Sequence, residues 1–260
     1  MTNQQILDIA LRQQAADMSC LPADFLREEN VVVLSGTSPQ ARKYLSLPFF
    51  CNFCTYGNNI VASVDARIAP FVRDYLQRER TANGTAFESL LTPRLHLLTE
   101  EFAKYGMLTT FMASYFLPDT AALQALPCPY PVRVLTPPDF ADLYTPQWRN
   151  ALCADRKQLD VLAAAAYDGD RLVGLAGCSA DGEDMWQIGI DVLPDYRRQG
   201  VASALTSRLA LEILARGKVP FYCCAWTNIR SQRNAVRSGF RPAWVELTAI
   251  EQARAAVYMR

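Results

Sequence analysis

The stretch that decides the fold reads Arg197-Arg198-Gln199-Gly200-Val201-Ala202. It follows an apolar run, residues 185–193, and leads into a helical pattern that begins near Val201. A strand that ends in a tight basic loop and turns directly into a helix holds phosphates well, because free N–H groups of the first helical turn and the helix dipole attract negative charge. Gly200 lets the backbone approach an anion closely. We therefore expect an anion-binding loop.

The glycine pattern of this loop excludes two well-known phosphate sites. It lacks the Gly-Lys-Ser/Thr of nucleoside-triphosphate loops and the three glycines of the dinucleotide fingerprint. What remains is Arg-x-x-Gly-x-Ala, preceded by Pro194 and Tyr196. This pattern resembles the pyrophosphate loop of the GCN5-related N-acetyltransferases (GNAT), a family that binds acetyl-CoA and usually carries Val-x-Pro-x-Tyr-Arg at this point.

Two further segments resemble the same family. Apolar residues recur with helical spacing from Val201 to Ile213, and Gly217 is placed to end that helix. A second apolar strand over 220–226 leads into a segment from Asn228 to Phe240. That segment is similar to the family's second motif, an asparagine, then Ala or Ser, then Gly-Phe, at the same spacing. Together the motifs cover about residues 160–245.

The resemblance implies the acetyltransferase fold for residues 131–260, whose fold class is α/β (α+β). We expect a mixed, mostly antiparallel and splayed sheet flanked by helices. Asp168-Gly169-Asp170 is a good hairpin turn between two of its strands. The other expected elements are a strand over 132–135, helical pieces over 138–144 and 147–154, strands over 161–167, 171–179 and 185–193, a last strand over 244–249, and a C-terminal helix.

Residues 1–130 read as a separate N-terminal α/β domain of unknown role. The segment 127–131 holds three prolines and marks the expected boundary. Two interpretations stay open, a degenerate partial copy of the acetyltransferase fold without a phosphate loop and an unrelated α/β cap. The expected elements are a helix over 3–14, a strand over 31–34, a hairpin over 49–64 with its turn at 57–59, a helix over 66–78, a helical pattern over 86–105 interrupted by Pro93, and a strand over 107–116.

Composition excludes several function classes. The 260 residues include 26 basic and 26 acidic ones, and a nucleic-acid or membrane-surface role usually needs a basic excess. No apolar run is long enough to span a membrane, and residues 1–5 have neither the basic start nor the apolar run of a signal peptide. We expect a cytoplasmic protein with no nucleic-acid and no membrane partner.

The eight cysteines offer one metal-like spacing, Cys51-x-x-Cys54. A structural zinc site needs a second ligand pair, but the only histidine is His96, in an expected helix, and the adjacent Cys223 and Cys224 alternate faces on a strand. We therefore expect buried thiols and no metal. A thiol or metal protein built on Cys51 and Cys54 is the third alternative for function.

The resemblance also implies where acetyl-CoA binds. The strand that ends at Val192 and the strand over 220–226 begin side by side and then splay, and the pantetheine arm pairs with exposed backbone in the gap. The pyrophosphate is expected on the N–H groups that follow Arg197. The implied cofactor-binding residues are Ile190, Asp191, Val192, Arg197, Arg198, Gln199, Gly200, Val201, Ala202, Ser203, Asn228 and Ser231.

The acid that protonates the leaving thiolate departs from the family pattern. Asn228 is a good helix N-cap, and the resemblance places it, with Ser231 at the next motif position, against the pantetheine or the thiol. Many members carry a tyrosine seven residues after this asparagine, where this chain has Ala235. Water or the Asn228 and Ser231 pair is one alternative, and Tyr222 and Tyr196 are the fallback candidates.

A general base is needed because an amine with a pKa of about 10 must lose a proton before it attacks. Asp191 is the first choice, since it lies in mid-strand beside the expected acetyl position. Glu183 and Asp184 lie at the start of that strand. For each carboxylate the competing interpretation is an ordinary surface charge, and a water chain would serve equally.

The leading hypothesis is an N-acetyltransferase that moves the acetyl group of acetyl-CoA to a primary amine by direct attack in a ternary complex. A non-catalytic acyl-CoA-binding or sensing protein is the alternative, and Ala235 favours it. The fold does not fix the acceptor. We expect a small amine substrate, and a homodimer is compatible with the sequence.

Overall fold

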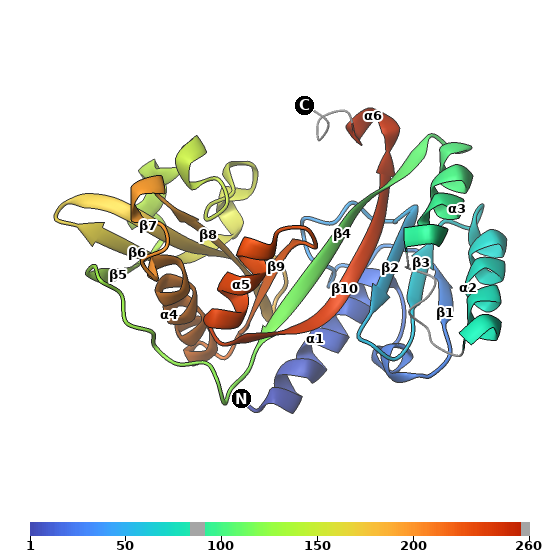
Figure 1. The fold of residues 1–260 in the computed structure, drawn as a ribbon, viewed down its shortest axis with the longest axis horizontal. Helices are drawn as coiled ribbons and strands as arrows, with labels where there is room; N and C mark the ends of the chain where they lie inside the picture. The colour runs from blue at the N-terminus through green and yellow to red at the C-terminus, as the bar shows by residue number, and fades with distance from the viewer. Residues whose placement is uncertain (84–91, 256–260) are drawn as a thin grey trace. The chain divides into compact units, whose positions relative to one another are not determined.

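The computed structural model describes residues 1–83 and 92–255, which form two compact units (Figure 1). Unit 1 consists of Met1–Ala10 and Tyr115–Pro242, and unit 2 consists of Leu11–Ser114 and Ala243–Arg260. Both units are thus built from two chain segments, and the boundary expected near residue 130 lies inside unit 1. A division at residue 130 would separate two continuous stretches of chain, whereas each unit here combines two stretches that are far apart in the sequence.

Three elements run from one unit into the other along the chain. They are α1 (Asn3–Met18), β4 (Met107–Pro118) and β10 (Phe240–Glu251). Helix α1 is longer than the helix expected over 3–14. Strand β10 includes the last strand expected over 244–249, but its residues from Ala243 onward belong to unit 2.

The sheet of unit 1 has the strand order β4-β9-β8-β7-β6-β5. Neighbouring strands from β5 to β8 are antiparallel, and β8 and β9 are parallel. The hairpin expected at Asp168-Gly169-Asp170 joins β6 and β7, and Gly169 has φ +58°. The strands span Val132–Leu135 (β5), Asp160–Asp168 (β6), Arg171–Ser179 (β7), Met185–Val192 (β8) and Val219–Ala225 (β9).

Two α-helices belong to unit 1, α4 (Val201–Ala215) and α5 (Ile229–Arg237), and both match the sequence motifs. The two helical pieces expected over 138–144 and 147–154 are instead short 3-10 turns. Prolines at their first positions start the turns, and Phe140 breaks the first with φ −117°. The 3-10 turns of unit 1 are Pro137–Leu143, Pro146–Trp148, Ala154–Leu159 and Pro194–Tyr196.

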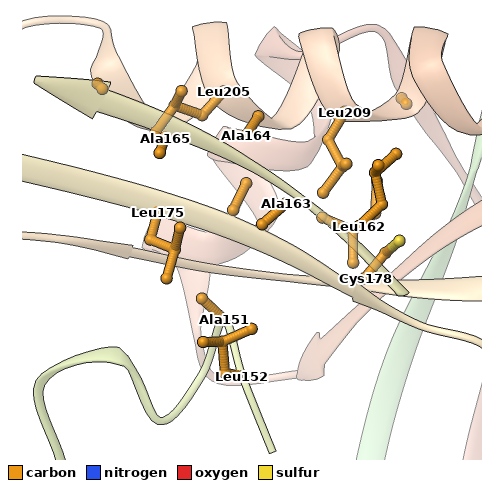
Figure 2. Close-up of a cluster of buried hydrophobic side chains, with 14 of the residues drawn as sticks. Ala151, Leu152, Leu162, Ala163, Ala164, Ala165, Leu175, Cys178, Leu205 and Leu209 are labelled. Carbon is orange, nitrogen blue, oxygen red and sulfur yellow. The ribbon is translucent and has the colours of Figure 1, made fainter. Parts of the chain in front are cut away.

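The core of unit 1 has two covered sheet faces, as Figure 2 shows. Leu205 and Leu209 of α4 lie on one side of β6 and β7, and Ala151 and Leu152 of an irregular segment lie on the other. Successive strand residues point to opposite faces, so the fully buried run from Ala163 to Ala166 requires cover on both. These small side chains allow close approach from either side.

The sheet of unit 2 has the order β1-β3-β2-β10-β4, with β2 and β3 forming the expected hairpin. Strand β10 pairs antiparallel with β2, with Val245 opposite Thr55. This pairing of residues far apart in the sequence carries the chain's last strand into unit 2. The elements of unit 2 are β1 (Val31–Leu34), β2 (Cys51–Thr55), β3 (Val61–Val64), α2 (Ala69–Asn83), α3 (Thr92–Ala103), α6 (Gln252–Ala255) and a 3-10 turn over Pro22–Leu26.

Two expectations for helices fall partly on residues 84–91 and 256–260, which lie outside the described residues. Pro93 does not interrupt a helix among the described residues, because it occupies the second position of α3, where proline is tolerated. The expected C-terminal helix is described for four residues. The mixed α/β class with a mostly antiparallel open sheet flanked by helices is confirmed.

The cysteines carry no metal cluster among the residues described. All eight are free, and no group of three or more His, Cys, Asp or Glu side chains in that part of the chain is arranged to hold a metal ion. Cys51 and Cys54 are buried in β2, and burial raises the pKa of both thiols. No helix within residues 1–83 and 92–255 has the length and apolar character to cross a membrane.

Candidate functional site

Strands β8 and β9 pair over only half of β8. Their register runs from Met185 opposite Val219 to Ile188 opposite Tyr222. On its other edge β8 stays paired with β7 as far as Val192. The backbone from Gly189 to Val192 therefore has no strand partner on the β9 side among the described residues, which is the splay that the resemblance implied.

The loop between β8 and α4 leaves its backbone donors open. Gly200 is the N-cap of α4 with φ +87° and supplies no capping side chain. Among residues 1–83 and 92–255, no hydrogen bond occupies the N–H groups of residues 199–203; the first helical bond is donated by Ala204 to Gly200. Open donors at a helix N-terminus are what the predicted anion site requires.

The two arginines of the loop have different surroundings. Arg197 donates from Nε to the carbonyl of Val192 at 2.9 Å, so it braces the end of β8. Arg198 is exposed and has φ +62°, in a region that residues other than glycine rarely occupy. A non-glycine residue held there often marks a functional constraint.

Other side chains fix the loop without using its N–H groups. The Gln199 side chain accepts a hydrogen bond from the Tyr130 hydroxyl at 2.9 Å and donates to the carbonyl of Asp195 at 3.1 Å. The Ser203 hydroxyl donates to Asn234 Oδ1 at 3.2 Å, which ties the first turn of α4 to α5. The loop is thus held from its edges while its centre stays open.

Asn228 and Ser231 lie together at the start of α5, as the motif predicts. The Asn228 side chain accepts from the Ser231 N–H at 3.1 Å, which makes it the N-cap. The Ser231 Oγ lies 2.7 Å from the hydroxyl of Tyr222 on β9. Ala235, at the position of the family's tyrosine, is fully buried. Tyr222 is therefore the phenol that reaches the Asn228 motif.

The environment of Tyr222 keeps its hydroxyl protonated. Burial raises the pKa of Tyr222, and hydrogen bonds with Ser231 and Asn234 offset this only in part. The other fallback, Tyr196, donates to Asp168 at 2.8 Å at the far end of β6. Of the two tyrosines, only Tyr222 is placed on a strand of the splay.

The Asp191 carboxylate is occupied by a neighbouring segment. It accepts from the Asn150 N–H at 2.8 Å, from Asn150 Nδ2 at 2.6 Å and from the Ala151 N–H at 3.0 Å. Glu183 is exposed in the turn before β8, and Asp184 pairs with Lys218 at 3.0 Å. Among the contacts described, no partner is shared by two of these three carboxylates.

Sequence reasoning missed the segment around Asn150 and the linking residue Asn234. Asn234 carries no local signal, because it looks like any polar residue on an exposed helix. For Asn150 a signal existed, since Gly177 and Gly189 interrupt strand interiors, and glycine there often marks a close backbone approach.

Comparison with known proteins agrees with this geometry. Residues 121–240 match the family model described as Acetyltransferase (GNAT) family. That segment is a GNAT acetyltransferase domain. No curated protein matches the sequence.

Several solved structures resemble the chain at low identity. A GNAT-family acetyltransferase from Novosphingobium aromaticivorans is 19% identical, with a TM-score of 0.41, over 55% of this chain and 66% of that one. A GCN5-related N-acetyltransferase-like protein from Streptococcus suis is 21% identical, with a TM-score of 0.44, over 62% and 69%. The acetyltransferase yncA from Salmonella typhimurium, solved with acetyl-CoA, is 16% identical, with a TM-score of 0.33, over 47% and 93%. The first of these matches spans less than two thirds of its relative.

Proposed function

We propose that this protein transfers the acetyl group of acetyl-CoA to a primary amine by direct attack in a ternary complex. The observation that carries the proposal is the open backbone of Gly189–Val192 beside the open N–H groups of residues 199–203. Strand backbone is normally paired, and the first N–H groups of a helix need a cap or a ligand. Leaving both groups open in one site suits a ligand with an amide-bearing arm and a phosphate end.

Acetyl-CoA fits this donor set residue by residue. The pyrophosphate would lie on the N–H groups of residues 199–203, where the dipole of α4 favours negative charge. The pantetheine amides would pair with the backbone of Ile190, Asp191 and Val192, as an added strand does. Acetyl-CoA supplies an activated thioester carbonyl when bound. Exposed Arg198 adds a cation near the phosphates.

The leaving thiolate needs a proton, and we assign Tyr222 as its donor. Its hydroxyl is 2.7 Å from Ser231 Oγ, and its pKa is raised by burial, so it carries a proton at neutral pH. Ser231 would hold the phenol in place, while Asn228 orders the first turn of α5 around both. A tyrosine from β9 would thus replace the family's helix tyrosine, whose position is Ala235.

For the proton of the amine we propose transfer to solvent. Asp191 already accepts three hydrogen bonds, and Glu183 lies in an exposed turn. Water therefore suits the role better than either carboxylate.

The test is turnover with a panel of primary amines that includes amino acids, polyamines and arylalkylamines. Wild-type protein is incubated with acetyl-CoA and each amine, and acetylated amine and CoA are measured by liquid chromatography and mass spectrometry. We expect stoichiometric product with at least one class and none from a Gly200→Glu variant. Acetyl-CoA binding without product from any class would instead support the sensing protein that Ala235 favours. Absence of both binding and product would overturn the proposal.

A further inference from the structure

The two faces of the β7–β8 pair are closed by different parts of the chain. On one face, a side chain at Gly174 would meet Val201 at 2.8 Å and Leu205 at 3.0 Å, so α4 lies directly on the strands. On the opposite face, a side chain at Gly189 would meet the carbonyl oxygen of Asn150 at 1.7 Å. Helix α4 thus covers one face of the pair, and the backbone at Asn150 lies directly on the other.

Two glycines on neighbouring strands leave room for the backbone of Asn150 and Ala151 on that face. Gly177 and Gly189 lie opposite each other in the β7–β8 register. A side chain at Gly177 would meet the carbonyl oxygen of Ala151 at 2.1 Å. Figure 2 shows Ala151 on the side of the strands away from Leu205 and Leu209. Any larger residue at either glycine would force this backbone away from the sheet.

Asp191 fastens the same segment two residues further along β8. Its carboxylate accepts both backbone N–H groups, of Asn150 and Ala151, and the side-chain amide of Asn150. Charge-assisted hydrogen bonds of this kind are stronger than neutral ones. Trp148 and Leu152 are buried on either side, while Arg149 and Asn150 stay exposed. The segment is therefore anchored at its middle and at both ends.

The anchored segment reaches β8 where the splay opens. Gly189 is the first residue of β8 beyond the last β8–β9 pair at Ile188. In the proposed function the reacting thioester lies in this gap. From this juxtaposition we infer that Asp191 is a positioning residue, which holds Arg149–Leu152 as a fixed wall of the acceptor site. That this site receives the acceptor rests on the proposed function. That Asp191 holds the segment rests on the contacts alone.

The rival role for Asp191 is the general base, and one substitution separates the two. Asparagine at this position keeps an oxygen for the two backbone N–H groups, and its amide can pair with a reoriented Asn150 side chain, but it cannot take a proton. Alanine removes both the clamp and the base. Asp191→Asn and Asp191→Ala therefore differ if Asp191 positions the segment, and agree if it is a base.

Hydrogen exchange in the free protein measures the clamp without any substrate. In Asp191→Ala we expect the amide of Asn150 to exchange about tenfold faster or more, since it loses its acceptor, and in Asp191→Asn much less. The amide of Ala151 should change less than that of Asn150, because it also donates to the carbonyl of Trp148 at 3.1 Å. Unchanged exchange in Asp191→Ala would overturn the inference. Because no ligand enters this measurement, its result does not depend on whether the protein is an acetyltransferase.

Kinetics with the best amine of the panel supply the second readout. We expect Asp191→Ala to raise the KM for that amine more than it lowers kcat, with acetyl-CoA affinity retained, and Asp191→Asn to recover most of the loss. Equal loss of kcat in both variants, with loss of the rising limb of the pH–rate profile, would identify a base and overturn the inference.

Substitutions at Gly189 and Gly174 provide a matched control that leaves Asp191 intact. Gly189→Ala displaces the segment, whereas Gly174→Ala presses on α4 from the neighbouring strand. We expect Gly189→Ala to raise the amine KM and Gly174→Ala to weaken acetyl-CoA binding. The reverse pattern would contradict the wall. If either variant fails to fold, the Asp191→Asn and Asp191→Ala comparison decides alone.

Discussion

Arg42 of unit 2 and Arg198 of unit 1 lie in opposite environments. In unit 2, Arg42 is only 3% exposed, although its guanidinium is charged. In unit 1, Arg198 is exposed at the open loop before α4. The first cation is enclosed by partners from its own unit, and the second stands beside N–H groups that have none.

The cluster around Arg42 is closed on itself. Arg42 donates from Nε to Asp17, from NH2 to Glu246 at 3.1 Å and Gln14 at 3.0 Å, and from NH1 to the hydroxyl of Tyr44 at 2.8 Å. Its backbone N–H also donates to Asp17 at 2.7 Å. These bonds join α1, β10 and an intervening loop, so the cluster fixes the fold of unit 2.

The comparison teaches how to separate structural from functional charge. A buried cation survives only when carboxylates and hydrogen bonds replace its hydration, so Arg42 has no capacity left for a ligand. Arg198 is exposed and can still bind a ligand, and its backbone φ is strained as well. The proposed acetyl-CoA site therefore lies in unit 1, beside Arg198.

The largest effect should follow Arg42→Met, which leaves Asp17 and Glu246 buried without a cation. Breaking a buried pair from one side costs about 3 kcal/mol or more, and we expect the free energy of unfolding of unit 2 to fall by that amount. Urea denaturation followed by hydrogen exchange measures it. The control is Arg67→Met, which removes an exposed partner of Asp65 and should lower the free energy of unfolding far less. Equal effects from both variants would refute the contrast.

Tyr222→Phe should come next. Removing the proposed acid should lower kcat about 10- to 100-fold, toward the weaker end of acid catalysis because a thiolate is a good leaving group. Acetyl-CoA affinity should stay within about twofold, since the ring remains. The control is Tyr167→Phe, which removes a phenol from β6. An unchanged kcat in Tyr222→Phe would remove Tyr222 from the mechanism.

Arg198→Gly should change binding and stability in opposite directions. Glycine relieves the left-handed angle and should stabilise unit 1 by about 0.5 kcal/mol. Loss of the cation should weaken acetyl-CoA binding about three- to tenfold, more at low salt than at high salt. Calorimetry at two salt concentrations and thermal unfolding measure both. If stability and affinity fell together, Arg198 would be a structural residue like Arg42.

The smallest effect is a difference between two aspartates in their response to pH. Burial raises the pKa of Asp17 above 3.8 despite Arg42, whereas hydrogen bonds from Asn3 and Ala121 lower the pKa of half-buried Asp119. The contribution of Asp17 to stability is present below its unfolded pKa and is lost as the pH rises through its folded pKa. That of Asp119 is present above its unfolded pKa and is lost as the pH falls through its folded pKa.

Carboxyl carbon NMR titration measures both groups in one experiment. Asp17 should titrate above 3.8 and Asp119 below it. Asp17→Asn should reduce the loss of stability on the alkaline side of that value, and Asp119→Asn the loss on the acid side. Shifts in the same direction would contradict the difference in environment.

Local signals in the sequence carried the prediction of the loop and of α5. The open loop follows from Gly200 and the helix behind it, and the N-cap follows from Asn228, because each depends on neighbouring residues alone. The hairpins at residues 57–59 and at Gly169 are equally local. The sequence alone therefore predicts which residues form these elements, without their positions in the fold.

Pairings between residues far apart in the sequence could not be predicted in this way. The antiparallel pairing of β10 with β2, and the ion cluster that joins Asp17, Arg42 and Glu246, depend on tertiary contacts across most of the chain. Nothing in the neighbourhood of these residues indicates their partners. The clamp at Asp191 was missed for the same reason, since its donors lie about forty positions earlier in the chain.

The central claim is that the loop before α4 binds acetyl-CoA through its backbone. Calorimetric titration of the wild-type protein with acetyl-CoA, beside Gly200→Glu, tests it most directly. Gly200 has φ +87° and open space around it, so glutamate would both strain the backbone and place negative charge at the open N–H groups. The account predicts micromolar binding by the wild type, on the order of the substrate constants usual for enzymes, and none by the variant. Equal binding by both proteins would place acetyl-CoA elsewhere and contradict the account.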